Sequence, residues 1–212
     1  MKRLRLPTRL FVTGTGTGVG KTMVSAILMA GTRGVYWKPV QSGLEEITDT
    51  QWIQQVTGLS DRHFQPERHR LRQALSPHAS AALDGVRIDL ADFELPDPAP
   101  FGHLIVEGAG GLLVPLNTSD FVIDLVVKLG LPALLVASSG LGTINHTLLS
   151  LDQLRSRNVP IAGVILNGPR NASNRAAIEH YGRAAVAEIE PQARISSGLL
   201  AQLFALNFRE EI

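Results

Sequence analysis

A short apolar segment that runs into a glycine-rich turn constrains the fold of this chain most strongly. Residues 10–22 read LFVTGTGTGVGKT, an apolar run followed by alternating threonine and glycine and then by Gly-Lys-Thr. Glycine lets the backbone adopt positive φ and turn successive N–H groups inward, where they and a helix N-terminus can surround phosphate oxygens. The segment therefore predicts a buried strand, a phosphate-binding loop and a helix.

The spacing of this loop departs from the common G-x-x-x-x-G-K-[ST] pattern. That pattern needs glycine at position 15, where the chain has Thr15, and five residues rather than four separate Gly14 from Gly20. We interpret the loop as a P-loop variant. In that interpretation Lys21 bridges the β- and γ-phosphates of a nucleotide, and the Thr22 hydroxyl binds Mg²⁺.

Beyond the loop, short apolar runs alternate with longer amphipathic stretches. Apolar runs of this length are typical of strands that are buried on both faces of a parallel sheet. The expected strands are Leu10–Thr13, Gly34–Lys38, His103–Val106, Ala133–Ala137 and Ile161–Leu166; the expected helices are Lys21–Ala30, Asp49–Thr57, Phe121–Leu129, Ile144–Arg157 and Ala172–Ile189. The alternation predicts one α/β domain of the P-loop NTPase type over residues 1–212, with a mostly parallel sheet flanked by helices.

Three segments fall outside this alternation. Met1–Arg9 is basic and is expected as a solvated lead-in to the first strand. Residues 57–74 are rich in Arg and His without apolar periodicity, so we expect a surface excursion there, for which the sequence indicates no function. Glu94–Pro100 contains three prolines and predicts an extended connector.

Composition excludes several classes of function. The 20 basic and 19 acidic residues give a net charge of +1, so no strong field favours nucleic acid or an anionic membrane. The absence of cysteine excludes disulfide scaffolds and thiolate chemistry, and it is compatible with a reducing cytoplasm, where we expect the protein. No apolar run approaches the ~20 residues of a membrane span.

Charged residues follow two further expected strands. Lys38 ends one strand and is followed by Pro39 and, at the same edge, Ser42. Glu107 ends the strand in LIVEGAGG, where glycines allow a ligand to approach the backbone closely. Ligands of open α/β sheets bind at the carboxyl edge of the strands, so Lys38 can stabilise charge on a transferring phosphoryl group. Glu107 and Asp49 are candidate Mg²⁺ ligands, although Asp49 could instead be a helix cap.

Two later segments also place polar groups at this edge. In LLVASSGLGTINHTLL a strand, a glycine turn and a helix N-terminus recur without Gly-Lys-Thr, which predicts a site for a smaller anion such as a carboxylate. In IAGVILNG the strand ends at Asn167, whose amide could recognise a nucleobase or could simply occupy a turn.

These segments, in this order, resemble the dethiobiotin synthetase family. The matching stretches cover most of the chain from Leu10 to about Gly168: VTGTGTGVGKT, YWKPVQSG, SPH at 76–78, VEGAGGLLVPL, LGTINHTLL and GVILNG. The family shares the longer loop spacing. The resemblance implies ATP- and Mg²⁺-dependent carboxylation and ring closure of 7,8-diaminopelargonic acid with CO₂ or bicarbonate, by way of a carbamate and a carbamic-phosphoric anhydride, which gives dethiobiotin, ADP and phosphate.

The resemblance also implies roles for individual residues. Lys21 and Lys38 would be catalytic, Thr22, Asp49 and Glu107 would bind the metal, and the protein would be a homodimer. The substrate-binding set would be Ser42 with Leu141, Gly142, Thr143, Ile144 and Asn145, the last five acting across the dimer interface on the substrate carboxylate. The nucleotide-binding set would be Gly18, Val19, Gly20, Lys21, Thr22, Met23, Asp49, Glu107, Gly108, Ala109, Gly110, Asn167 and Gly168.

Several positions depart from the family pattern. Gly16, Gly18 and Gly140 stand where many members carry charged residues. Residues 193–200 read ARISSGLL, so the late strand that usually lines the nucleobase pocket is expected to be missing, which leaves base selectivity undetermined.

An alternative is a P-loop ATPase switch of the partition or division-positioning class. Such switches carry an extra lysine near the start of the loop, whereas Thr13–Val19 contains none.

Overall fold

A parallel sheet of seven strands forms the centre of the computed structural model, which describes residues 3–210. Its strand order is β10-β9-β8-β2-β7-β3-β5, and all its pairings are parallel. The strands are β2 (Arg9–Gly14), β3 (Val35–Trp37), β5 (Phe64–Gln65), β7 (Leu104–Gly111), β8 (Ala133–Ser138), β9 (Ile161–Asn167) and β10 (Val186–Ile189). The five strands expected from the apolar runs are all present, which confirms the predicted α/β class.

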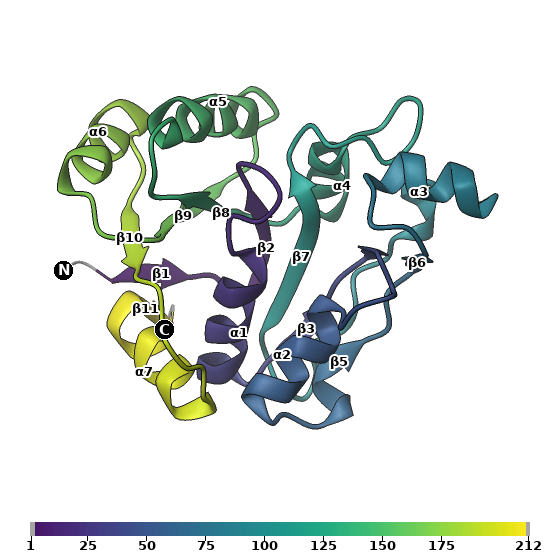
Figure 1. Cartoon of the computed structure of the whole chain (residues 1–212), viewed down its shortest axis with the longest axis horizontal. Coiled ribbons are helices and arrows are strands. Elements are labelled where there is room, and N and C mark those ends of the chain that lie inside the picture. The colour runs from purple at the N-terminus through teal and green to yellow at the C-terminus, as the bar shows by residue number, and fades with distance from the viewer. Residues whose placement is uncertain (1–2, 211–212) are drawn as a thin grey trace.

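Helices cover both faces of this sheet (Figure 1). The helices are α1 (Lys21–Thr32), α2 (Asp49–Thr57), α3 (Pro77–Asp84), α4 (Val122–Leu129), α5 (Thr143–Ser156), α6 (Ala172–Gly182) and α7 (Ser197–Asn207), with 3₁₀ turns at η1 (Asp61–His63) and η2 (Leu90–Asp92). Alternate residues of β2 serve opposite faces: Leu10 and Val12 pack in the core beneath α1 and α7, whereas Phe11 packs with α4. A third apolar cluster joins β8 and β9 to α5 and α6. Among the described helices, none is long and apolar enough to cross a membrane.

The C-terminal part of the sheet differs from the expectation. The helix predicted over Ala172–Ile189 ends at Gly182, because Arg183 adopts a left-handed conformation with φ +44°. Residues 186–189 are all buried and form β10, which pairs with β9. Residues 193–200 form no strand, since α7 begins at Ser197, but β10 lies shortly before them, and the carbonyl of Ile189 accepts a hydrogen bond from Gly168 N at 2.9 Å.

The segment 57–74 is part of the fold rather than a surface excursion. Its strand β5 extends the central sheet by pairing with β3, and β6 (His69–Leu71) pairs with β4 (Val40–Ser42) in a second, two-stranded sheet. His63 and His69 are buried, and Nδ1 of His63 lies 2.8 Å from the carbonyl of Gly34. The prediction failed because strands of two or three residues are too short to produce a recognisable hydrophobic period. The extended connector at 94–100 is confirmed.

The described part of the N-terminal lead-in, residues 3–9, is also structured, while Met1 and Lys2 lie outside the described residues. Residues Leu4–Leu6 form β1, which pairs in parallel with β11 (Phe208–Glu210). Leu4 and Leu6 are buried while Arg5 is exposed, which is the alternation of a strand with one buried face. The basic residues had obscured this alternation.

Candidate active site

The phosphate loop lies between β2 and α1, at the carboxyl edge of the sheet. Gly18 and Gly20 have φ values of +75° and +99°, which L side chains rarely adopt. Gly20 is the N-cap of α1 and offers no side chain to the first N–H groups of the helix, so these groups remain available to an anion. The local geometry is that predicted for a phosphate-binding loop.

Lys21 folds back across this loop. Its Nζ donates a hydrogen bond to the carbonyl of Gly16 at 3.0 Å, and only 7% of the residue is exposed. Burial lowers the pKa of Lys21 below its ordinary value, and the charge of Lys38 adds to this effect, although two carboxylates oppose it. The ammonium group therefore lies where a bound phosphate would meet it.

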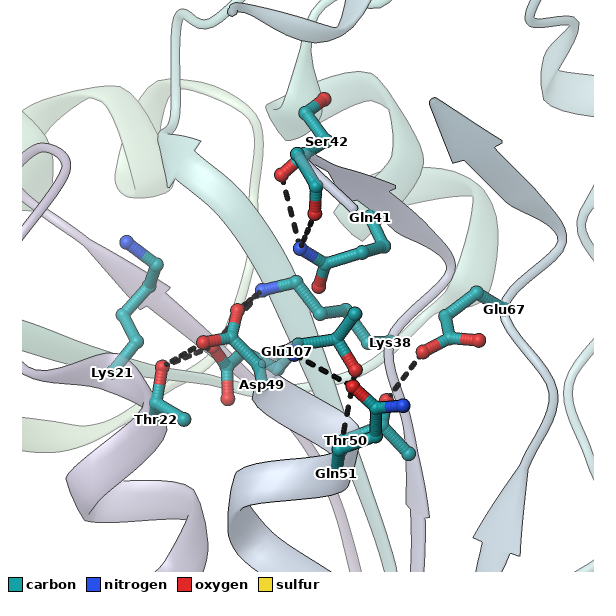
Figure 2. A network of polar contacts seen from close by, with 12 residues as sticks. Lys21, Thr22, Lys38, Gln41, Ser42, Asp49, Thr50, Gln51, Glu67 and Glu107 are labelled. Atoms are coloured by element: carbon teal, nitrogen blue, oxygen red, sulfur yellow. Dashed lines mark hydrogen bonds and ion pairs between the residues drawn. The ribbon is translucent and has the colours of Figure 1, made fainter. Parts of the chain in front are cut away.

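The structure brings Lys38, Asp49 and Glu107 together from three different elements (Figure 2). Lys38 follows β3, Asp49 opens α2 behind its Thr48 cap, and Glu107 lies in β7. The Nζ of Lys38 forms ion pairs with Asp49 and, at 3.2 Å, with Oε1 of Glu107. These residues are far apart in the sequence, and Lys38 and Glu107 meet because β3 and β7 are parallel neighbours in the sheet.

Thr22 joins the same cluster. Its Oγ1 donates to Asp49 Oδ1 at 2.7 Å and lies 3.2 Å from Glu107 Oε1.

Burial alone would lower the pKa of Lys38, but Glu107 and Asp49 outweigh it and raise this pKa. Burial would likewise raise the pKa of Asp49, yet Lys38 and Thr22 lower it. Both groups are consequently charged at neutral pH.

Tyr36 supports the cluster from the protein interior, and its role was not predicted from the sequence. Its hydroxyl donates to Glu107 Oε2 at 3.1 Å, and both residues are fully buried. One oxygen of Glu107 is thus held by Tyr36, while the other faces Thr22 and Lys38. The only available signal was that Tyr36 lies two positions before a candidate catalytic lysine.

The oxygen set at this point fits a magnesium ion. Mg²⁺ prefers oxygen ligands and is usually bound by one or two carboxylates together with substrate phosphates and water. Thr22, Asp49 and Glu107 supply a hydroxyl and two carboxylates, and with Lys38 they leave one net negative charge. Residues 3–210 contain no group of three or more His, Asp or Glu suited to a metal. Phosphate oxygens and water would complete the coordination at this site, as is usual for Mg²⁺.

A cavity of about 690 Å³ opens beside these residues. Lys21, Thr22 and Lys38 line it, together with Asp49 and Glu107. Further along, its wall is formed by Gln41 and Ser42 of β4 and by residues 74–77, which include the start of α3. The cavity therefore joins a phosphate-binding end to an end of mixed polarity, formed by β4 and residues 74–77.

The other residues predicted to bind nucleotide lie in different surroundings. Gly18, Gly20, Ala109 and Gly110 line the cavity. Gly108 instead serves packing, because a Cβ there would lie 2.6 Å from Cε1 of Phe11. Of the remaining residues, Met23 packs against the core, Gly168 N donates to the carbonyl of Ile189, and the carbonyl of Val19 accepts from Asn167.

Asn167 contacts the phosphate loop itself. Its Nδ2 donates to the carbonyl of Val19 at 3.1 Å, and a Cβ on Gly20 would collide with its side chain. The amide is thus engaged by the loop, which the sequence did not suggest.

The predicted carboxylate site lies apart from the cavity. Gly142 is the N-cap of α5, with φ +90° and no side-chain cap, while Leu141 is completely exposed and Asn145 is exposed. Thr143 is buried and donates to the carbonyl of Ser138 at 2.5 Å. None of residues 141–145 lines the cavity within one chain.

A glycine-rich loop at the edge of a parallel sheet, with a lysine, a threonine and two carboxylates around it, defines the class of P-loop nucleotide-binding proteins. Structural comparison agrees. The MinC:MinD cell division protein complex of Aquifex aeolicus matches with a TM-score of 0.54 at 15% sequence identity, covering 92% of this chain and 86% of that chain. A likeness at this identity concerns the fold alone.

Sequence comparison defines the family more closely. A family profile described as an AAA domain matches residues 8–197. The ATP-dependent dethiobiotin synthetase BioD of Paramagnetospirillum magneticum is 48% identical over 195 residues, which span 92% of this chain and 93% of the relative. The biotin biosynthesis bifunctional protein BioCD of Bordetella avium is 46% identical over 202 residues, 95% of this chain but only 43% of that longer relative. The chain belongs to the dethiobiotin synthetase family, a family of ATP-dependent enzymes within the AAA-domain group.

Proposed function

We propose that this chain catalyses the ATP- and Mg²⁺-dependent conversion of 7,8-diaminopelargonic acid and CO₂ to dethiobiotin, ADP and phosphate. The observation that carries the proposal is the convergence of Lys38, Asp49 and Glu107 on Thr22, beside a cavity that continues past the nucleotide site. Phosphoryl transfer depends mainly on positioning and on neutralising charge, which are what these residues supply.

The proposed reaction has three steps. An amine nitrogen of the diamine attacks CO₂ and loses a proton, which gives a carbamate. A carbamate oxygen then attacks the γ-phosphorus of ATP, ADP leaves, and a carbamic-phosphoric anhydride forms. Finally the second amine attacks the carbonyl carbon of the anhydride, loses a proton and expels phosphate, which closes the ureido ring.

The charged residues have distinct tasks in this scheme. Lys21 and the N–H groups at the start of α1 hold the β- and γ-phosphates. Lys38 places its ammonium between the γ-phosphoryl group and the carbamate oxygen, where negative charge is concentrated during transfer. Thr22, Asp49 and Glu107 would hold Mg²⁺, which neutralises phosphate charge when bound. For Lys38 to take its role, it has to exchange part of its contact with the two carboxylates for contact with substrate.

We further propose that the enzyme works as a homodimer. Leu141, Gly142 and Asn145 are exposed, and residues 141–145 lie outside the cavity, so a second subunit could bring its α5 N-terminus to the carboxylate of the diamine. Leu141 is exposed at this helix start, and the exposed Leu113 and Leu149 line one hollow with His146 of α5, which supports a contact surface beside α5. Ser42 would contact the reacting end of the substrate.

The test is phosphate release from ATP and Mg²⁺ with bicarbonate, measured with and without 7,8-diaminopelargonic acid, with the organic product identified by mass. We expect release that requires the diamine and yields dethiobiotin. Release that ignores the diamine would contradict the proposal and favour an ATPase switch. The Lys38→Ala variant, with exposed Lys128→Ala as its matched control, links the activity to this site.

A further inference from the structure

The side chain of Gln41 is held in a single orientation inside the cavity. Only 7% of the residue is exposed. Its Nε2 donates to the carbonyl oxygens of Ser42 at 3.0 Å and of Gly43 at 3.2 Å, as the dashed lines of Figure 2 show. The nitrogen end of the amide is thus bound to the turn that follows β4.

These two contacts also fix which end of the amide is oxygen. Rotating the amide by half a turn would place Oε1 against two carbonyl oxygens, all of them acceptors without a hydrogen to share. Oε1 of Gln41 therefore points away from the turn. It is buried and has no hydrogen-bond partner among the described residues.

A buried acceptor without a donor is unfavourable, and such groups in native proteins call for an explanation. Here the explanation lies in the position, because Gln41 lines the cavity that also holds Lys21 and Lys38. The Oγ of the adjacent Ser42 is likewise buried without a partner. Two neighbouring polar atoms of one cavity wall are thus left for a ligand to satisfy.

We propose that Oε1 of Gln41 accepts a hydrogen bond from an amine N–H of the diamine substrate and thereby determines which functional group of the substrate enters this end of the cavity. The inference deepens the proposed function and rests on it. An amide oxygen accepts only, so it favours an N–H group and disfavours phosphate or carboxylate oxygens, which carry no hydrogen at neutral pH.

The contact would also assist the first chemical step. A neutral amine has two N–H bonds and one lone pair. If Gln41 accepts one N–H, the nitrogen is oriented while its lone pair stays free to attack CO₂, and the same contact remains after the carbamate has formed.

A double-mutant cycle between protein and ligand tests the inference. Binding of 7,8-diaminopelargonic acid, 7-aminononanoate and 8-aminononanoate is measured by calorimetry, with Mg²⁺ and a non-hydrolysable ATP analogue present. The proteins are the wild type, Gln41→Met, which lacks the acceptor, and Gln41→Glu, which keeps one. Gln202→Met on the exposed face of α7 is the matched control.

We expect Gln41→Met to weaken diamine binding about 10-fold, the effect of losing one such hydrogen bond in a buried site. The same variant should bind one of the two monoamines, the one that lacks the contacted nitrogen, as well as the wild type does. Gln41→Glu loses the same contacts to the turn as Gln41→Met but keeps an acceptor, so it should retain more diamine affinity than Gln41→Met, and Gln202→Met should change nothing.

Three results would overturn the inference. Equal weakening of all three ligands by Gln41→Met, accompanied by the same weakening in Gln41→Glu, would mean that Gln41 only supports the turn at 42–43. Unchanged diamine binding in Gln41→Met would mean that Oε1 meets no substrate donor. A wild type that binds nucleotide but no diamine would overturn the proposed function and the inference together, which separates that failure from the other two.

Discussion

The N-termini of α1 and α5 are locally alike. Each follows a buried strand of the central sheet, and each begins at a glycine N-cap in a left-handed conformation, with φ +99° at Gly20 and φ +90° at Gly142. Neither N-cap carries a side chain that could satisfy the first N–H groups. By helix geometry alone, both could bind an anion.

Their surroundings differ. The start of α1 is surrounded by charged groups from other elements, namely Lys38 after β3, Asp49 of α2 and Glu107 of β7. The start of α5 has the fully exposed Leu141 beside it, and Thr143 uses its hydroxyl on the neighbouring Ser138 carbonyl. A helix N-terminus thus becomes a phosphoryl-transfer site through the charged side chains that neighbouring strands and helices place around it.

The largest effect is expected from Lys38→Ala. Losing the ammonium group should lower diamine-dependent phosphate release by at least about 100-fold, comparable to removing one preorganised charge-stabilising donor. Because Glu107 would then be buried without its cation, thermal stability must be checked by circular dichroism. Near-normal turnover in a folded variant would remove Lys38 from the mechanism, and Lys128→Ala should behave like the wild type.

The next effect is expected from Glu107→Gln. Replacing a charged ligand by a neutral one should raise the Mg²⁺ concentration needed for nucleotide binding by about 10- to 100-fold. Fluorescence titration of a labelled ATP analogue at a series of Mg²⁺ concentrations measures this, with the exposed Glu179→Gln as control. An unchanged Mg²⁺ dependence would place the metal elsewhere.

A pair of glycine substitutions compares the two helix starts directly. Gly20→Ala adds a Cβ that collides with Asn167 at positive φ, so we expect nucleotide affinity to fall about 10-fold. At Gly142 a Cβ has room, the nearest atom being Cε1 of His146 at 3.6 Å. Gly142→Ala should therefore cost about 1–2 kcal/mol of stability from its backbone conformation alone and leave nucleotide affinity unchanged. Equal loss of nucleotide affinity in both variants would contradict the distinction drawn between the two sites.

The smallest effect is expected from Tyr36→Phe. It removes the hydroxyl that holds Glu107 Oε2 while keeping the buried ring. The Mg²⁺ concentration needed for nucleotide binding should therefore rise about 5-fold. The freed oxygen should also let Glu107 bind larger cations in a bidentate manner, which shifts preference from Mg²⁺ toward Ca²⁺. The matched control is Tyr181→Phe, at the other tyrosine, which is exposed. A higher Mg²⁺ requirement with an unchanged preference for Mg²⁺ over Ca²⁺ would mean that Tyr36 does not set the geometry of Glu107.

The sequence was most informative about functional residues that lie at, or directly after, a recognisable apolar strand. The phosphate loop and Lys38 each follow a recognisable buried strand, and Glu107 lies within another, so their meeting at one sheet edge could be predicted. Tyr36 and Gln41 could not be identified in this way, because their importance depends on contacts made only after β3, β4 and β7 are assembled.

The misjudged elements have a related cause. β5 and β6 are two and three residues long, and β10 follows α6 after a left-handed residue rather than a proline or a clear turn. Hydrophobic period cannot distinguish such short strands from loops or helix ends. Recognition of a nucleobase by Asn167 stays a prediction, because its amide contacts the phosphate loop. β10 pairs with β9 beside Asn167, and the sequence did not predict this strand.

The central claim, phosphoryl transfer to a carbamate at the start of α1, is tested most directly by an isotope experiment. The enzyme is given ATP, Mg²⁺, 7,8-diaminopelargonic acid and freshly prepared ¹³C¹⁸O₂, and both products are analysed by mass before the label exchanges with water. The account predicts ¹³C and ¹⁸O in the ureido carbonyl of dethiobiotin and one ¹⁸O in the released phosphate, because the phosphorylated carbamate oxygen leaves with phosphorus. Labelled dethiobiotin accompanied by unlabelled phosphate would contradict it.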